Sequence, residues 1–143
     1  MILILGGTTE GRMAVKVADE AGSLYYYATR GSLQQIVCKY GIHVTGGMDL
    51  PYMIEFCRSN SIRLLIDAAH PFAMELHRTV AATSEALQLP VVRVERTYPE
   101  YSADLVWCDD YEDAIKKLKE AGIIRLLALT GVQTIGMLQD YWK

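Results

Sequence analysis

Three glycines near the N-terminus form the segment of this chain that could bind a phosphate. Gly6, Gly7 and Gly11 follow a short apolar run with the spacing G-G-x-x-x-G. Glycine lets a ligand approach the backbone, and the first amide groups of a helix attract an anion. The spacing differs from G-x-G-x-x-G, so a tight strand-to-helix turn without a ligand is the alternative. We expect a nucleotide cofactor to bind along this turn, at Gly6, Gly7, Thr8, Thr9 and Glu10.

Arg30 is a second candidate phosphate ligand, and it follows the aromatic run Tyr25–Tyr27. In a dinucleotide-binding sheet, the residue after the second strand meets the adenosine ribose, where an acid suits NAD and an arginine suits the 2′-phosphate of NADP. No Asp or Glu follows closely, so the sequence predicts NADPH rather than NADH. The neighbours Thr29, Gly31 and Ser32 are expected to belong to the same site. An exposed arginine without a ligand is the alternative.

The most unusual local run is DAAHPFA at residues 67–73, which combines an acid, an imidazole and a proline. His70 could donate to a phosphate or a carboxylate, or protonate a substrate, with Asp67 orienting it. Alternatively, these side chains only cap a turn and fix the start of a helix. We predict cofactor contacts at Asp67 and Ala68. We predict substrate contacts at His70 and Pro71, with His70 as the candidate catalytic residue.

Two further arginines, Arg93 and Arg96, lie on and just after an expected strand. Their guanidinium groups could bind an acidic substrate. A solvated edge with a Glu-Arg pair is the alternative. His43 and His77 are assigned to the surface or to helix faces.

Composition limits the class of protein. The chain has 143 residues, of which 51% are hydrophobic and 22% charged, so we expect a single globular domain over residues 1–143. A net charge of -3 without a basic stripe argues against a nucleic-acid partner. The 3 cysteines lack metal-ligand spacing, which predicts free thiols, no metal and a cytoplasmic location. The first apolar run is too short for a membrane span, so we expect no membrane partner.

Alternating strand and helix patterns position these candidate residues. The expected strands cover residues 2–5, 23–29, 41–45, 62–66, 91–94, 105–107 and 124–129. The expected helices cover residues 10–21, 33–39, 50–59, 71–87 and 111–121, with a terminal helix from residue 130. This alternation predicts an α/β fold, in which a doubly wound, mostly parallel, Rossmann-like sheet has helices on both faces. Ligands of such sheets bind at the carboxyl ends of the strands, where the candidate residues gather.

Five segments together resemble the precorrin-6A (cobalt-precorrin-6A) reductase family. They are ILILGGTTEGR at 2–12, ATRG at 28–31, DAAHPFA at 67–73, RVER at 93–96 and LTGV at 129–132. The resemblance implies an NADPH-dependent oxidoreductase of cobalamin biosynthesis that transfers a hydride to a double bond of the precorrin-6A or cobalt-precorrin-6A macrocycle. It also implies that the nucleotide binds along residues 6–10 and 29–32, and that the carboxylate-rich tetrapyrrole lies near His70 and residues 93–96.

Members of this family have a second Rossmann-like half beyond the point where this chain ends. The resemblance therefore implies that a second domain or chain completes the active site, and that the activity of this chain alone is incomplete. A nonenzymatic NADP-binding domain or partner subunit is the alternative function. A nucleotide-sugar epimerase or short-chain reductase would need a Tyr-x-x-x-Lys pair, which the sequence lacks around the fifth expected strand and the helix after it.

Overall fold

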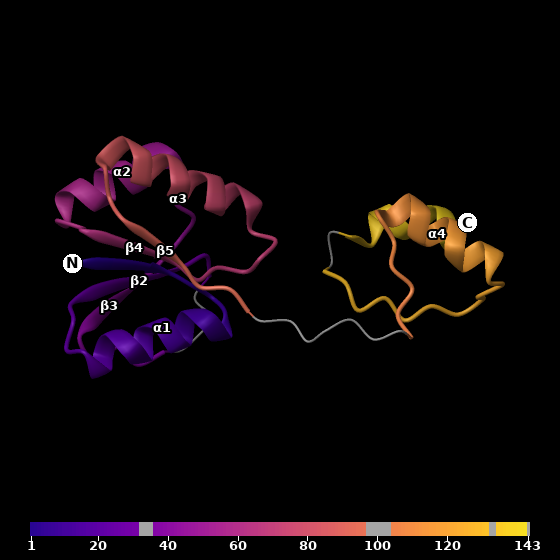
Figure 1. The fold of residues 1–143 in the computed structure, drawn as a ribbon, viewed down its shortest axis with the longest axis horizontal. Helices are drawn as coiled ribbons and strands as arrows, with labels where there is room; N and C mark the ends of the chain where they lie inside the picture. Colours follow the sequence, from indigo (N-terminus) through magenta and orange to yellow (C-terminus); the bar gives the residue numbers. More distant parts are fainter. Residues whose placement is uncertain (32–35, 97–103, 132–133, 143) are drawn as a thin grey trace. The chain divides into compact units, whose positions relative to one another are not determined.

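The computed structural model describes residues 1–31, 36–96, 104–131 and 134–142. The chain forms two compact units, Met1–Tyr98 and Pro99–Lys143. The first is a layered α/β unit and the second is smaller and helical (Figure 1). The single domain expected over residues 1–143 stays a prediction.

A five-stranded parallel sheet forms the centre of the first unit. Its strands are β1 (Ile2–Leu5), β2 (Tyr25–Thr29), β3 (Gly41–Thr45), β4 (Leu64–Asp67) and β5 (Val91–Arg93). They lie in the order β3-β2-β1-β4-β5, and every neighbouring pair is parallel. The chain therefore starts in the middle of the sheet and extends it in both directions, as the first five strands of a Rossmann sheet do. The predicted doubly wound α/β fold is confirmed.

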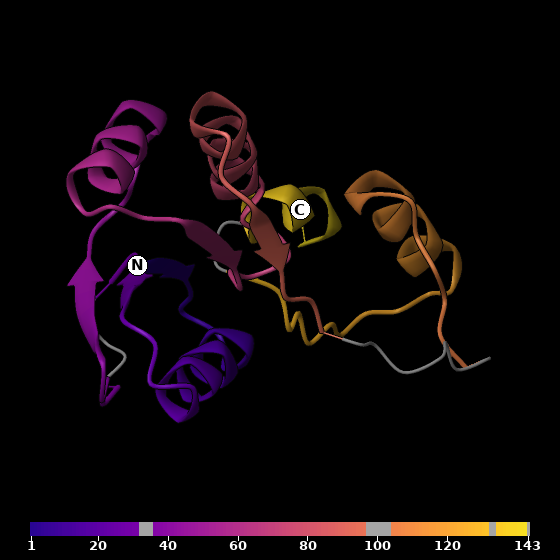
Figure 2. The same ribbon diagram turned by 60° about the vertical axis from the view of Figure 1, so that its left-hand side comes forward.

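Three helices cover the faces of this sheet: α1 (Thr9–Glu20), α2 (Leu50–Ser59) and α3 (Met74–Leu87). Helix α1 lies on one face, and α2 and α3 lie side by side on the other (Figure 1, Figure 2). Helix α2 begins where the sequence predicts, because the Asp49 side chain accepts a hydrogen bond from the Tyr52 amide at 2.9 Å. The helix expected over residues 33–39 lies partly outside the described residues.

Helix α3 begins later than the sequence predicts. The expected start at Pro71 is wrong, because the Ala73 amide donates to the His70 carbonyl at 2.8 Å and closes a turn before the helix. Ala73 precedes the helix without a side-chain cap. Residues 68–73 therefore form a separate loop between β4 and α3.

Two apolar clusters hold the helices against the sheet. Strand β1 contributes to both clusters, because alternate side chains of a strand point to opposite faces. One cluster contains the buried residues Leu3, Leu5, Ala28, Met53, Cys57, Ile62, Leu65 and Val80. The other contains Ile4, Val15, Ala18, Tyr25 and Tyr27. Burial of each large apolar side chain contributes about 1.5–3 kcal/mol to folding, so these clusters fix the positions of the strand ends.

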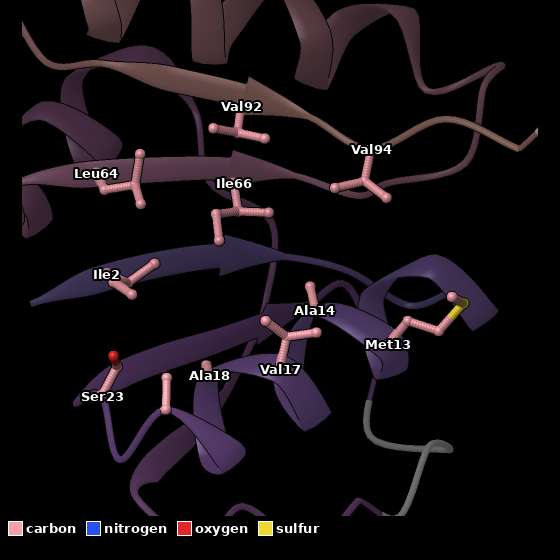
Figure 3. Close-up of a pocket in the computed structure, with 11 residues that line it drawn as sticks. Ile2, Met13, Ala14, Val17, Ala18, Ser23, Leu64, Ile66, Val92 and Val94 are labelled. Carbon is pink, nitrogen blue, oxygen red and sulfur yellow. The ribbon is translucent and has the colours of Figure 1, made fainter.

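An apolar pocket of about 420 Å³ lies between α1 and the strands β1, β4 and β5 (Figure 3). Aliphatic side chains form most of its lining. The residues labelled in Figure 3 are Ile2, Met13, Ala14, Val17, Ala18, Ser23, Leu64, Ile66, Val92 and Val94. None of these side chains is charged, so the pocket suits an apolar group rather than an anionic ligand.

The second unit contains α4 (Tyr111–Glu120), the 3-10 helix η2 (Gly136–Leu138) and α5 (Gln139–Trp142). The strands expected over 105–107 and 124–129 are wrong, because neither segment is part of a sheet in the described part of this unit. A strand needs a neighbour to satisfy its backbone groups, and here the side chains of Ile124 and Leu127 are 90% and 80% exposed. The helix expected from residue 130 is the short pair η2 and α5.

Candidate functional site

The glycine turn joins β1 to α1 at the carboxyl end of the sheet. Gly7 has a φ of 101°, and nothing lies within 4 Å of the position that a Cβ atom would take there. Only glycine adopts this conformation without strain. Thr8 caps α1, because its Oγ1 accepts from the Gly11 amide at 3.1 Å. The turn thus presents open backbone surface at a helix N-terminus, which suits an anionic group.

Tyr27, a fully buried residue of β2, lies beneath this turn and explains two of its glycines. Its hydroxyl oxygen accepts from the Gly7 amide at 2.9 Å. A Cβ atom on Gly6 would lie 2.3 Å from Tyr27 Cε2, and one on Gly11 would lie 2.8 Å from the Cα atom of Gly6. Packing therefore accounts for Gly6 and Gly11 without a ligand, whereas Gly7 borders open space.

Thr8 connects the glycine turn with the end of β4. Its Oγ1 donates to the Ala68 carbonyl at 2.7 Å, and the Ala68 amide donates to the Leu5 carbonyl at 2.9 Å. Ala68 is fully buried. These bonds bring together the turn and the residues after β4, two segments in which the sequence predicts cofactor contacts.

An ion pair connects the start of α1 with the segment after β5. Arg96 donates from Nε to Glu10 Oε1 at 2.9 Å and from Nη2 to Glu10 Oε2 at 3.3 Å. The hydrogen bond from Arg96, with a further one from the backbone amide of Glu10, lowers the pKa of Glu10 from 4.5 to about 2. Glu10 is thus a carboxylate at the turn where we expect the cofactor's phosphates, and Arg96 balances its charge.

The end of β2 holds the residues expected around a 2′-phosphate. Thr29 is buried, and its Oγ1 donates to the Gly31 carbonyl at 2.9 Å and lies 2.7 Å from His43 Nε2. The hydroxyl hydrogen of Thr29 is therefore used within the turn. Arg30 is exposed at the position that the sequence predicts. Ser32 lies outside the described residues.

Asp67, at the end of β4, is the centre of a cluster of polar side chains. Its carboxylate is 4% exposed, and Oδ2 accepts from Arg93 Nη1 at 2.7 Å and lies 2.8 Å from His77 Nδ1. Its Oδ1 accepts from the Ala69 amide at 3.3 Å. Because an unpaired buried charge is costly, these partners hold β4, β5 and α3 together around the carboxylate. A cofactor contact at Asp67 stays a prediction.

Both arginines expected to bind the substrate contact carboxylates of the chain. Arg93 donates from Nε to Glu95 Oε1 at 2.7 Å, in addition to its bond with Asp67. Arg96 is paired with Glu10. The Arg93 and Arg96 side chains are 29% and 52% exposed, so a substrate carboxylate could share these guanidinium groups.

His70 is exposed in the loop between β4 and α3, and its ring lies beside that of Phe72, which is also exposed. Its Nδ1 accepts from the Phe72 amide at 3.2 Å, and the two rings lie 5.3 Å apart. Phe72 is 85% exposed, and an exposed aromatic ring beside an imidazole suits a flat ligand. The run predicted from sequence at residues 67–73 includes Phe72 but gives it no role, because a large apolar residue becomes informative only when its exposure is known.

His77 is the second residue of the site that sequence reasoning missed. It lies on a helix, as one of the two expected assignments has it, but its side chain is only 14% exposed and its Nδ1 lies 2.8 Å from Asp67 Oδ2, so it is not a surface residue. His77 lies in the first turn of α3, which is the next element of the chain after β4. A helix that packs back on the preceding strand brings its first turn to the strand end, and this rule could have placed His77 near Asp67.

Within the described ranges, no group of three or more His, Cys, Asp or Glu side chains could hold a metal ion. No helix in those ranges has the length and apolar character needed to cross a bilayer. Cys38, Cys57 and Cys108 are free thiols, and burial raises the pKa of Cys57 to about 11.

Comparison with known proteins assigns this chain to a family. The family model for precorrin-6x reductase CbiJ/CobK matches residues 1–143. The chain belongs to the precorrin-6x reductase family. The resemblance to the reductase family is thereby confirmed. The roles of the residues at the carboxyl ends of the strands stay predictions.

Several members of the precorrin-6x reductase family are similar to this chain. The precorrin-6A reductase of Rhodococcus erythropolis is 30% identical over 99% of the chain and 59% of its own length. The cobalt-precorrin-6A reductase of Priestia megaterium is 28% identical over 94% of the chain and 54% of its own length. A solved structure of CobK precorrin-6A reductase, 23% identical, matches 71% of the chain and 41% of its own with a TM-score of 0.64. The chain thus spans little more than half the length of the curated relatives.

Proposed function

We propose that this chain is the NADPH-binding part of a precorrin-6A or cobalt-precorrin-6A reductase of cobalamin biosynthesis. The observation that carries the proposal is the open backbone surface at Gly7, beside the end of β4, in a member of a reductase family. Ligands of parallel α/β sheets bind at this edge. The relatives are longer than this chain, which favours a second domain or chain that completes the site. A cytoplasmic location and a tetrapyrrole substrate belong to the same proposal.

The residues at the turn fit a dinucleotide phosphate. Gly7 leaves room for close approach to the backbone, and Thr8 fixes the turn against β4. Glu10 would repel a phosphate if its charge were not balanced, and the bidentate bond from Arg96 provides that balance. Glu10 is therefore compatible with an anionic cofactor at the turn, where Thr9 and Gly6 are further expected contacts.

The exposed guanidinium of Arg30 fits the 2′-phosphate that distinguishes NADPH from NADH. An arginine stays charged at all physiological pH values and can bind a phosphate through two N–H groups. Gly31, next to it, is also exposed and leaves room for the ligand. This arrangement supports NADPH over NADH.

The substrate proposal rests on the loop after β4 and on the two arginines. NADPH, when bound, supplies the hydride for reduction of a ring double bond. His70 and Phe72 present an imidazole and an aromatic ring to a flat macrocycle, with Pro71 between them. Arg93 and Arg96 are expected to bind carboxylates of the ring. His70 is a candidate for protonating the second ring carbon, with water and the second half of the enzyme as the alternatives.

Calorimetric titration of the 143-residue chain with NADPH and then NADH, at one salt concentration, tests the cofactor proposal. Arg30→Ala should weaken NADPH binding by about 1.5 to 3 kcal/mol, roughly 10- to 150-fold, because a charged hydrogen bond is lost. NADH binding should change little. Arg63, exposed and adjacent to the amino end of β4, supplies the matched control Arg63→Ala, which should leave both affinities unchanged.

Equal weakening of both cofactors by Arg30→Ala would refute the 2′-phosphate assignment. Absence of binding to either cofactor would refute the proposed site in this chain. The alternative is a nonenzymatic NADP-binding domain or partner subunit, favoured by the partial coverage of the relatives. Selective NADPH binding without turnover of precorrin-6A or its cobalt form supports that alternative, and turnover by the chain excludes it.

A further inference from the structure

His77 faces two carbonyl groups of the loop between β4 and α3. Its Nε2 lies 3.0 Å from the His70 carbonyl oxygen and 3.3 Å from that of Pro71. Carbonyl oxygens only accept hydrogen bonds, so Nε2 carries a hydrogen and donates it. On the other side of the ring, Nδ1 contacts the Asp67 carboxylate at 2.8 Å and Nη1 of Arg93. These contacts fix the ring so that Nε2 points at the loop.

A single peptide group connects His77 with His70. The Pro71 carbonyl and the Phe72 amide belong to one planar unit, whose C=O and N–H point in opposite directions. The carbonyl oxygen accepts from His77 Nε2, and the N–H donates to His70 Nδ1 at 3.2 Å. His77 therefore orients the amide that contacts the ring of His70.

We propose that His77 is a positioning residue that fixes the exposed His70 in its Nε2–H tautomer. Because Nδ1 of His70 accepts from the Phe72 amide, Nε2 carries the hydrogen of the neutral ring. His70 then donates a hydrogen bond from Nε2 to an anionic group of the ligand.

If the ligand is a tetrapyrrole, that anionic group is a carboxylate of the macrocycle. This binding role of His70 rests on the proposed function. In the Nε2–H tautomer the neutral ring is a hydrogen-bond donor rather than a proton donor, since loss of the Nε2 hydrogen would leave an anionic imidazole. The arrangement thus favours a binding role for His70, with the proton for the ring carbon coming from water or the second half of the enzyme.

Side-chain ¹⁵N spectra of the labelled 143-residue chain, recorded at about pH 8 where histidine is largely neutral, test the proposal. Wild-type His70 should show a pyridine-type Nδ1 and a pyrrole-type Nε2. His77→Ala should lose this pattern and show averaged signals from both tautomers. His77→Gln retains an N–H donor and should restore the wild-type pattern at least in part.

The control is Arg78→Ala, which changes the neighbouring residue of α3. Arg78 is exposed and pairs with Glu75, so the His70 signals should not change. Unchanged amide signals from β1 show that each variant is folded. Retention of the Nε2–H tautomer in His77→Ala, or averaged tautomers in the wild type, would overturn the proposal. If His77→Ala does not fold, averaged His70 signals in a folded His77→Gln variant would overturn it as well.

Titration with uroporphyrin, a carboxylate-rich porphyrin, tests the underlying function separately. Binding of uroporphyrin should shift the His70 Nε2 signal. His77→Ala should weaken the affinity for uroporphyrin about 2- to 10-fold, as expected for one misplaced hydrogen bond. A single tautomer in the wild type without any response to uroporphyrin would count against substrate binding by His70. That result would leave the positioning role of His77 intact, so the two proposals fail in distinguishable ways.

Discussion

Replacement of Gly6 by alanine isolates the steric role of the glycine turn. A Cβ atom there would lie 2.3 Å from Cε2, 2.6 Å from the hydroxyl oxygen and 2.7 Å from Cζ of Tyr27. Tyr27 is fully buried and its hydroxyl is bonded to the Gly7 amide, so the ring has little room to move. Since φ of Gly6 is outside the left-handed range, backbone strain does not contribute to the effect.

The expected loss of stability follows from this overlap. Overpacking a close-packed core costs about 1–3 kcal/mol, and contacts this short with a buried ring place the cost of Gly6→Ala at about 3 kcal/mol. For a unit of the size of Met1–Tyr98, each kcal/mol lowers the Tm by roughly 4–8 °C, so we expect a decrease of about 12–24 °C. Thermal and urea unfolding, followed by near-UV circular dichroism and by the amide signals of β1, measure the effect in the first unit.

Gly47→Ala is the matched control, because nothing lies within 4 Å of the added Cβ and φ is outside the left-handed range. Its stability should stay within about 0.5 kcal/mol of the wild type. A double-mutant cycle adds a second check, since Gly6→Ala should cost less than about 1 kcal/mol in a Tyr27→Ala background. If Gly6→Ala is as stable as Gly47→Ala, or if its effect is additive with Tyr27→Ala, the steric explanation is refuted.

Two further predictions concern the Glu10–Arg96 ion pair and the thiols. Arg96→Gln should raise the pKa of Glu10 from about 2 towards 4.5. Carbon-detected NMR titration of the Glu10 carboxyl group measures this pKa, and a value of about 2 in the variant would contradict the prediction. Folding lowers the pKa of Glu10 in the wild type. The wild type should therefore be more stable than Arg96→Gln above pH 4.5, and this difference in stability should disappear as the pH falls to about 2. With a disulfide reagent at about pH 8, the exposed Cys108 should react at once, and Cys108→Ser should remove that phase. Cys57, 2% exposed and with its pKa raised to about 11, should react only as the first unit unfolds, so rapid native labelling of Cys57 would be the contrary result.

Most of the first unit could be predicted from sequence because its signals are local. Helix α2 has the predicted bounds, since the Asp49 cap and the apolar spacing after it define both its start and its face. Strands β1 and β3 also have their predicted bounds. In contrast, residues 105–107 and 124–129 have the composition of buried strands but no strand partner in the described second unit. The composition of a segment indicates that it could form a strand. Whether it does so depends on a neighbouring strand, which the local sequence does not specify.

The candidate site could be located from sequence but its contacts could not. The topology of a parallel sheet places the turn after β1, Arg30 and Asp67 at one edge, and the structure has them there. Sequence spacing carries no information about the bond from Thr8 to Ala68 or about His77 beneath the loop. These contacts join residues far apart in the chain or depend on where α3 begins, and they require the packed fold.

The position of Tyr27 also restricts how this chain can diverge. Its ring occupies the volume that a side chain at Gly6 would need, and its hydroxyl lies 3.0 Å from where a Cβ of Gly11 would be. An alanine at Gly6 is therefore accessible only after the aromatic ring has been replaced by a smaller side chain. Loss of the ring removes the hydrogen bond to the Gly7 amide and leaves a cavity in the core. Each single step is thus destabilising, and positions 6 and 27 are expected to change together in evolution rather than one at a time, whereas Gly11 stays restricted by the Cα atom of Gly6 whatever residue stands at position 27.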